Sequence, residues 1–119
     1  MHHIHLTTAN PEVLRKWYVK TFGAENGTRR SLPATMFNGN EVDFLTANAP
    51  TPPVPTKGRA IDHIGFEVRN LEAFVRQLQA DGVTIEAPYR NMPNLDLKIA
   101  FIVDPVGTRI ELTEGLRGK

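Results

Sequence analysis

The chain contains no cysteine among its 119 residues. Disulfide bonds, thiolate metal sites and cysteine nucleophiles are therefore excluded. This absence suits a protein of the reducing cytoplasm, which is the location that the sequence favours.

The chain also lacks an excess of charge of either sign and any long apolar run. Its net charge is +1, with 40% hydrophobic and 23% charged residues, so there is no electrostatic reason to expect nucleic acid or a membrane surface as a partner. No apolar stretch approaches the roughly 20 residues of a membrane span, and no signal-peptide core opens the chain. The first expected strand begins almost at Met1, so a targeting segment upstream of this sequence stays an open alternative. The length predicts a single compact domain, residues 1–119.

The first 46 residues predict a strand, a helix and three more strands. From His3 to Thr7 the residues alternate, with Ile4 and Leu6 on one face and the histidines on the other, which is typical of a half-buried strand. Asn10-Pro11-Glu12 favours a helix start and Gly23 a helix end, with an apolar stripe between them. Pro33 and the Asn38-Gly39-Asn40 turn then separate three expected strands, residues 29–32, 34–37 and 41–45.

Prolines dominate the segment that follows. Pro50, Pro52, Pro53 and Pro55 are four of the nine prolines, and proline cannot donate to a strand ladder. Residues 47–59 are therefore predicted to be a semi-rigid connector between two modules, residues 1–46 and 60–119. A proline-rich ligand for a partner protein is the alternative.

The second half repeats the order of the first. A strand is expected at 61–68, then a helix capped by Asn70 and ended by Gly82, with Leu71, Phe74, Val75 and Leu78 as its stripe. A strand at 83–87 and an irregular stretch through Pro88 and Pro93 follow. Strands at 98–103 and 108–113 form a hairpin around Asp104-Pro105-Val106-Gly107, a sequence that suits a type I turn.

The two halves also correspond residue by residue. His3 and His63 are 60 positions apart, as are Asn10 and Asn70, while Asp43 and Glu111 are 68 apart. Such internal repetition is a fold-level signal. It predicts an α+β fold of two tandem βαβββ modules, with curved mixed sheets around a central cavity.

This repeat places four candidate metal ligands at equivalent positions. The strand alternation turns His3 and His63 away from the aliphatic face, and it does the same for Asp43 and Glu111. If the halves close against each other, two imidazoles and two carboxylates converge. That donor set suits a borderline divalent ion: Zn, Ni, Co, Mn or Fe.

The same residues resemble the vicinal oxygen chelate superfamily, which includes glyoxalase I, extradiol dioxygenases and bleomycin-resistance proteins. Asp62-His63-Ile64-Gly65-Phe66 looks like its first-strand signature, and Phe101 to Leu112 is similar to its closing hairpin, a DPxG turn followed by a glutamate. The resemblance implies that His3, Asp43, His63 and Glu111 hold the metal.

Several alternatives stay open at this point. Asp43 stands where a glutamate or glutamine is more usual in that superfamily, and Glu41 on the same face is a substitute for it; His5 competes with His3 in the same way. Without a ligand from the first carboxylate position, the remaining two histidines and one carboxylate form a triad of the kind that supports Fe(II) oxygen chemistry. The run from Met1 to His5 is also compatible with a cloning-tag remnant, although Ile4 interrupts it.

The resemblance implies a glyoxalase-type enzyme as the leading function. The ion would chelate two adjacent oxygens of a small substrate, with Glu111 as the general base for isomerisation or lyase chemistry and Asp43 or Glu41 as the opposite acid/base. An Fe(II) extradiol-type dioxygenase and a non-enzymatic drug- or metabolite-binding protein are the rivals. A homodimer is the expected assembly. Residues 26–32 and 89–96 are expected to form substrate loops, and Arg109 either pairs with Glu67 or holds an anionic substrate.

Overall fold

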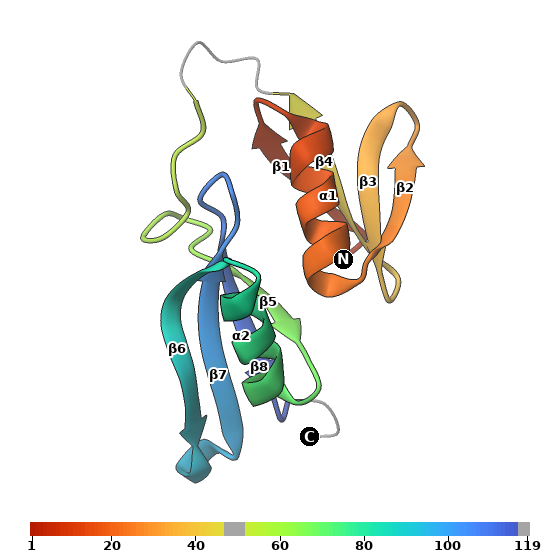
Figure 1. The fold of residues 1–119 in the computed structure, drawn as a ribbon. Helices are drawn as coiled ribbons and strands as arrows, with labels where there is room; N and C mark the ends of the chain where they lie inside the picture. Colours follow the sequence, from red (N-terminus) through yellow and green to blue (C-terminus); the bar gives the residue numbers. More distant parts are fainter. Residues whose placement is uncertain (47–51, 117–119) are drawn as a thin grey trace. The chain divides into compact units, whose positions relative to one another are not determined.

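The computed structural model describes residues 1–46 and 52–116. Within it the chain divides into two compact units, Met1–Val54 and Pro55–Lys119. Figure 1 shows the elements of each unit along the chain.

The first unit is a four-stranded mixed sheet with one helix against it (Figure 1). Strand β1 pairs in parallel with β4, and the remaining neighbours in the order β1-β4-β3-β2 are antiparallel. Its elements are β1 (His3–Thr8), α1 (Pro11–Phe22), β2 (Glu25–Arg29), β3 (Leu32–Phe37) and β4 (Asn40–Thr46).

The second unit repeats this topology. Its sheet has the order β5-β8-β7-β6, with β5 and β8 parallel and the other pairs antiparallel. Its elements are β5 (Ile64–Glu67), α2 (Leu71–Ala80), β6 (Thr84–Met92), the 3-10 turn η1 (Pro93–Leu95), β7 (Leu97–Val103) and β8 (Arg109–Glu114). The predicted α+β fold of two βαβββ modules with curved, mixed sheets is confirmed, and each sheet is open rather than closed on itself.

The strand register preserves the sequence repeat. In the first unit His5 lies opposite Asp43, and in the second Gly65 lies opposite Glu111. His5 and Gly65 are 60 residues apart and Asp43 and Glu111 are 68 apart, which are the two offsets of the sequence repeat. His5 therefore occupies the position that Gly65 has in the second unit.

Each helix covers its sheet through the stripe predicted from the sequence. Leu14 and Tyr18 of α1 are buried, and Phe44 of β4 lies in ring contact with Tyr18 at 5.6 Å. In the second unit the buried side chains are Leu71, Val75 and Leu78 of α2 and Ile102, Ile110 and Leu112 of the sheet. Full burial of one such side chain contributes about 1.5–3 kcal/mol, so these faces hold each helix on its sheet.

The two helix starts differ, and one prediction is wrong. Asn10 caps α1 as expected, since its side chain accepts a hydrogen bond from Val13 N at 3.2 Å. Asn70 precedes α2 in the left-handed region at φ 49°, and its side chain makes no cap bond. Glu114 of β8 replaces it by accepting from Leu71 N at 2.7 Å. A cap from a distant strand leaves no local sequence signal.

The strands around Pro33 also differ from the predictions. Residues 29–32 span the last residue of β2, a two-residue turn and the first residue of β3, and Pro33 lies inside β3. Pro33 is tolerated because it is paired only with Thr28 of β2, while the register with β4 begins at Ala34. The expected substrate loop 26–32 is thus mostly strand.

In the second unit the first strand, β5, is shorter than predicted, and the second strand, β6, is longer. β5 begins at Ile64, so His63 lies just before it, whereas β6 continues through Pro88 to Met92. Two register shifts in β6, between Ile85 and Ala87 and between Ala87 and Arg90, accommodate the proline. The expected loop 89–96 is therefore half strand.

The hairpin turn after β7 is confirmed. Asp104 is 4% exposed, and its Oδ1 accepts from Val106 N at 3.0 Å and from Thr108 N at 2.8 Å. Gly107 has φ 93°, and a side chain there would meet Pro55 at 2.9 Å. Both backbone conformation and space therefore require glycine at this position.

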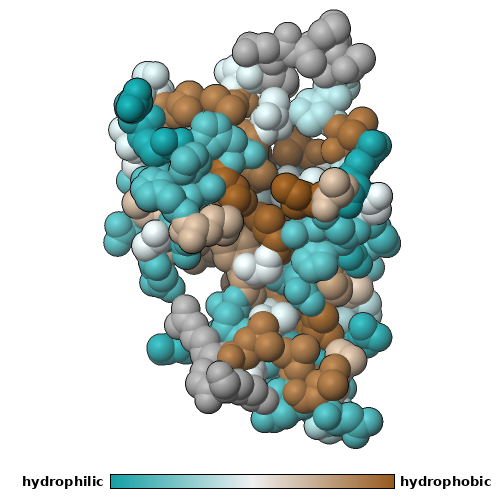
Figure 2. All heavy atoms as spheres, turned by 180° about the vertical axis from the view of Figure 1, so that it is seen from behind, coloured by the Kyte–Doolittle hydropathy of each residue, from teal (hydrophilic) through white to brown (hydrophobic). Residues whose placement is uncertain are grey.

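Apolar side chains reach the surface at separate points along the chain. Val13, Val54, Ile61, Leu95 and Leu116 are all more than half exposed, and brown areas interrupt the teal surface in Figure 2. Scattered exposed apolar residues are ordinary for a globular protein. Neither helix in the described part of the chain is long and apolar enough to cross a membrane.

Candidate functional site

The first unit brings three possible metal ligands together. His3, His5 and Asp43 each offer a ligand atom, and these atoms lie within 4.8 Å of one another. The two histidines are alternate residues of β1, so they share one face, and Asp43 lies opposite His5 on the adjacent strand. The sequence placed His3 and His5 as alternatives, whereas here both belong to one cluster.

Asp43 is the buried member of this cluster, with a relative exposure of 0%. Its Oδ2 accepts from Arg29 Nε at 2.5 Å and lies 3.2 Å from His5 Nε2. Its Oδ1 is buried and has no hydrogen-bond partner within residues 1–46 and 52–116. A buried carboxylate oxygen without a partner is costly, so this atom is a vacant acceptor that a cation would satisfy.

The tautomer of neutral His5 follows from its contact with Arg29. A terminal guanidinium nitrogen of Arg29 lies 2.6 Å from His5 Nε2. Because a guanidinium can only donate, Nε2 accepts and the ring proton of neutral His5 sits on Nδ1. The Nε2 lone pair, which a metal would use, is therefore directed at Arg29.

Glu41, the proposed substitute for Asp43, lies beside the cluster. Its Oε2 is 3.4 Å from Arg29 Nε and 3.9 Å from His2 Nδ1, and it is not among the three residues whose ligand atoms lie together. Asp43 is thus the better-placed carboxylate of the first unit.

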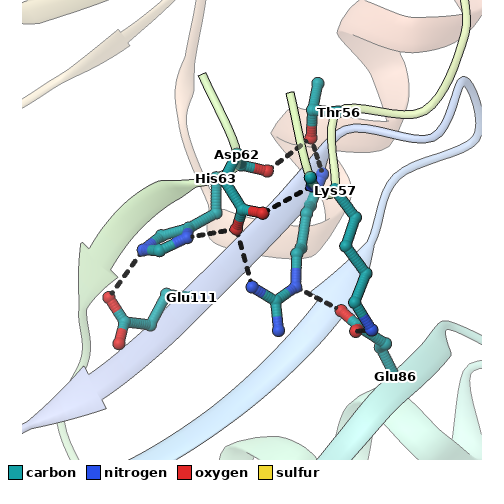
Figure 3. A network of polar contacts seen from close by, with 8 residues as sticks. Thr56, Lys57, Asp62, His63, Glu86 and Glu111 are labelled. Carbon is teal, nitrogen blue, oxygen red and sulfur yellow. Dashed lines mark hydrogen bonds and ion pairs between the residues drawn. The ribbon is translucent and has the colours of Figure 1, made fainter. Parts of the chain in front are cut away.

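The second unit brings the other two predicted ligands together. His63 Nε2 lies 3.4 Å from Glu111 Oε2 (Figure 3), and the His63 ring contacts the Phe101 ring edge-on at 5.5 Å. The side chains of His63 and Glu111 are 36% and 26% exposed, so both remain accessible to a ligand. A side chain at Gly65 would lie 3.7 Å from Glu111 Oε2, so this glycine leaves room around the carboxylate.

Asp62 orients His63, a role that the sequence reasoning missed. Asp62 Oδ1 lies 2.7 Å from His63 Nδ1, and Oδ2 accepts from Gly58 N at 2.6 Å. The Gly58 N–H, His63 and Arg109 together hold the pKa of Asp62 well below its ordinary value. As an ionised carboxylate only accepts, His63 donates from Nδ1 and directs Nε2 toward Glu111. The adjacency of Asp62 and His63 in the sequence was the available signal.

Arg109 is held by neighbours other than the expected one. It donates to Asp62 Oδ1 at 2.7 Å and to Glu86 Oε2 at 2.6 Å, and its guanidinium lies 3.9 Å from the centre of the Phe101 ring. The hydrogen bond to Glu86 raises the pKa of Arg109 further. Glu67 instead accepts from Thr113, Gly115 and Leu116. Of the two alternatives for Arg109, the salt bridge is the one that the structure shows, with Asp62 and Glu86 as partners in place of Glu67.

The segment before β5 is tied to this network. Thr56 Oγ1 accepts from Arg109 N and donates to the Asp62 carbonyl, both at 2.8 Å, and Lys57 pairs with Glu86 (Figure 3). Thr56 N also donates to Gly107 O at 3.0 Å. These contacts fix the end of the proline-rich segment, and through it Asp62 and His63, on the sheet. Residues 47–51 of the predicted connector lie outside the described residues.

All four ligands predicted from the sequence thus have a potential co-ligand in their own unit. His3 and Asp43 lie in one cluster with His5, and His63 faces Glu111. That the two groups share one ion, across an enclosed cavity, stays a prediction.

The chain matches one known protein family and several solved structures. The sequence model described as Glyoxalase/Bleomycin resistance protein/Dioxygenase superfamily matches residues 1–112. No curated protein matches. Among solved structures, TioX from Micromonospora sp. ML1 is similar over 97% of this chain and 98% of its own, with a TM-score of 0.76 and 19% identity.

Two further structures show the same fold. A glyoxalase family protein from Enterococcus faecalis matches with a TM-score of 0.71 and 23% identity, over 96% of each chain. A glyoxalase/bleomycin resistance protein/dioxygenase from Alicyclobacillus acidocaldarius matches with a TM-score of 0.71 and 15% identity, over 98% of this chain and 91% of its own. At these identities the likeness concerns the fold.

Proposed function

This chain belongs to the Glyoxalase/Bleomycin resistance protein/Dioxygenase superfamily, and from that membership and its donor geometry we propose that it is a divalent-metal-dependent enzyme of the glyoxalase type. The superfamily contains enzymes as well as non-enzymatic resistance proteins. The proposed reaction is proton-transfer isomerisation or lyase chemistry on a small substrate with two adjacent oxygens.

The His3–His5–Asp43 cluster is the observation that carries this proposal. Two imidazoles and a carboxylate offer ligand atoms within 4.8 Å, and the partnerless buried Oδ1 of Asp43 is an acceptor that a cation would satisfy. Mixed nitrogen and oxygen donors suit Zn, Ni, Co, Mn or Fe. His63 and Glu111, the other two predicted ligands, are proposed to complete the set.

The proposed role of each residue follows from its exposure. A bound divalent ion supplies Lewis-acid polarisation of the substrate oxygens. Asp43 is buried and its Oδ1 is a vacant acceptor, so its proposed role is that of a ligand. Glu111 is accessible and is the proposed general base: its carboxylate takes a carbon-bound proton and returns it to the neighbouring carbon for isomerisation, while the hydroxyl proton of the substrate passes to the adjacent oxygen. In the lyase variant a leaving group departs from that neighbouring carbon instead. Asp62 keeps His63 in the tautomer whose Nε2 faces Glu111.

An Fe(II) extradiol-type dioxygenase is the second candidate. The finding that favours it is that two histidines and one carboxylate meet within a single unit, since this donor set supports Fe(II) oxygen chemistry. Oxygen consumption by the Fe(II)-loaded protein with a catechol supports this candidate over the first. Absence of oxygen uptake, with proton exchange from an α-hydroxycarbonyl, supports the first.

Metal stoichiometry tests the proposal. Purified protein is titrated with Zn²⁺ and analysed for bound metal, alongside the variants His3→Ala, His5→Ala and His63→Ala. His2→Ala is the matched control, because His2 is the one remaining histidine of the sequence and is not among the three residues of the cluster. We expect one ion per chain, lost or weakened in the three variants and kept in the control. No bound ion in the unaltered protein refutes both enzyme candidates and leaves a binding protein.

The assembly and organisation are proposed from the same membership. We propose a cytoplasmic homodimer whose single domain comprises module one (1–46), the connector (47–59) and module two (60–119). A mass of 13.3 kDa per chain makes the two states easy to separate by light scattering. A monomer at micromolar concentration refutes the dimer.

A further inference from the structure

One arginine enters the cluster of proposed ligands. Arg29 lies at the end of β2, an edge strand of the sheet, and its side chain reaches across β3 to β4. Its Nε lies 2.5 Å from Asp43 Oδ2 and 3.4 Å from Glu41 Oε2, and a terminal nitrogen lies 2.6 Å from His5 Nε2. The guanidinium therefore contacts two of the three residues that form the cluster.

These contacts engage two atoms that a metal ion could also bind, Asp43 Oδ2 and His5 Nε2. A guanidinium only donates hydrogen bonds, so Asp43 Oδ2 and His5 Nε2 both direct electron pairs at Arg29. We propose that Arg29 is an internal cation that holds the His3–His5–Asp43 cluster and must be displaced before a divalent ion binds there. Arg29 thereby sets the metal affinity of the chain. This inference rests on the proposed function of the cluster.

The electrostatics of Asp43 explain why a cation is held there. A carboxylate with no exposed surface is strongly destabilised unless a positive charge accompanies it. Arg29 supplies that charge but satisfies only Oδ2, because Oδ1 keeps no partner in the described chain. A divalent ion and the guanidinium repel each other at such distances, so they compete for Asp43.

The second unit has no such competitor among its described residues. Glu111 is paired with His63, and within residues 1–46 and 52–116 it forms no ion pair with an arginine or lysine. Arg109, the nearby guanidinium, is committed to Asp62 and Glu86. The internal cation is thus a feature of the first unit, and it distinguishes Asp43 from its sequence counterpart.

The test compares Zn²⁺ affinity in the full chain and in two arginine variants, by calorimetry at constant pH. Arg29→Gln removes the charge from the cluster. Arg30→Gln is the matched control, since Arg30 is the next residue, is exposed, and sits at φ 56° in the turn after β2. We expect Arg29→Gln to bind Zn²⁺ at least ~10-fold more tightly than the unaltered protein, because a like charge within a few ångströms weakens cation binding strongly. The control should bind as the unaltered protein does.

Metal-free stability gives a second readout. Without Zn²⁺, Arg29→Gln should melt at a lower temperature than the unaltered protein, because Asp43 loses its counter-charge, and Zn²⁺ should restore the difference. The control should show neither effect. If Arg29→Gln does not fold, the Arg29 Nε–H signal of the unaltered protein is followed by NMR during Zn²⁺ titration. A shift that saturates with Zn²⁺ supports displacement, and an unchanged signal at saturation overturns it.

The outcomes separate this inference from the proposed function. Equal Zn²⁺ affinity in Arg29→Gln and the unaltered protein overturns the role of Arg29 and leaves metal dependence standing. Binding only in Arg29→Gln supports the internal cation and overturns the metal-dependent function. Binding in neither overturns both.

Discussion

The most specific stability prediction concerns the start of α2, where a strand residue replaces the usual cap. Glu114 Oε2 accepts from Leu71 N at 2.7 Å, and Asn70 contributes no side-chain bond. Glu114 Oε1 also accepts from Lys98 Nζ at 2.8 Å. The variant Glu114→Ala removes both contacts and leaves the first N–H of the helix without its partner.

The magnitude follows from the burial of that N–H. Leu71 is 0% exposed, and leaving a buried donor unsatisfied costs about 1–3 kcal/mol, comparable to the 0.5–2 kcal/mol of a lost helix cap. We therefore expect Glu114→Ala to lower the free energy of unfolding by about 1–2 kcal/mol. For a domain of this size each kcal/mol corresponds to a drop in Tm of roughly 4 °C or more.

Urea unfolding followed by circular dichroism measures this loss, and two variants locate its cause. Lys98→Gln keeps the cap and removes only the ion pair; Lys98 is 40% exposed, so the pair contributes little. Glu114→Gln keeps an oxygen that can accept from Leu71 N and should be milder than Glu114→Ala. If Glu114→Ala loses no more stability than Lys98→Gln, the reasoning that β8 caps α2 is wrong.

Three further outcomes are expected. Asn10→Ala should lower the free energy of unfolding by about 0.5–2 kcal/mol, because it removes the cap of α1. Asn70→Gly should leave the free energy of unfolding unchanged, since φ is 49° at this position and its side chain makes no cap bond. Thermal melts of the two variants measure this difference. Asp104→Ala should cost about 1–3 kcal/mol by freeing two N–H groups, and Asp104→Asn much less, in urea titrations. The hydrogen bond from Arg109 lowers the pKa of Glu86 from its ordinary 4.5, so the stability it contributes is present above about pH 4.5 and is lost as the pH falls. Between pH 7 and pH 3 the free energy of unfolding should fall less in Arg109→Gln than in the unaltered protein. An equal fall in both would contradict the assignment of this pH dependence to the Arg109–Glu86 contact.

The fold could be read from the sequence because its signals are local and occur twice. The alternation of β1, the stripe of each helix and the turn at Asp104 all depend on neighbouring residues, and the repeat turns two weak patterns into one strong one. The errors arose where tertiary contacts override local preference. Pro33 and Pro88 favour breaks, yet strand pairing on one side and register shifts on the other keep both inside strands.

The candidate ligands could be named from the sequence, but the side chains that contact them could not. Strand alternation placed His3 and Asp43 on one face, and the repeat placed His63 and Glu111 on another. Arg29, which controls Asp43, comes from the far edge of the sheet, fourteen residues away in sequence. Asp62 is held by Gly58 and Arg109, contacts that depend on how the segment before β5 folds onto the hairpin. Pairings between strands of this kind leave no periodic pattern in a single sequence.

The two units differ in how their charged side chains are paired. Glu41 and Arg109 occupy corresponding positions, on the strand that pairs with the first strand of each unit, and each is paired with a residue from the outer strand: Glu41 with Arg29 at 3.4 Å, and Arg109 with Glu86 at 2.6 Å. The sign of the pair is reversed. In the first unit the arginine reaches Asp43 and His5, whereas in the second the arginine contacts Asp62, and Glu111 faces His63. The same fold therefore yields one carboxylate that is buried and neutralised and another that is open. This asymmetry supports the proposed roles, in which Asp43 holds a cation and Glu111 moves a proton.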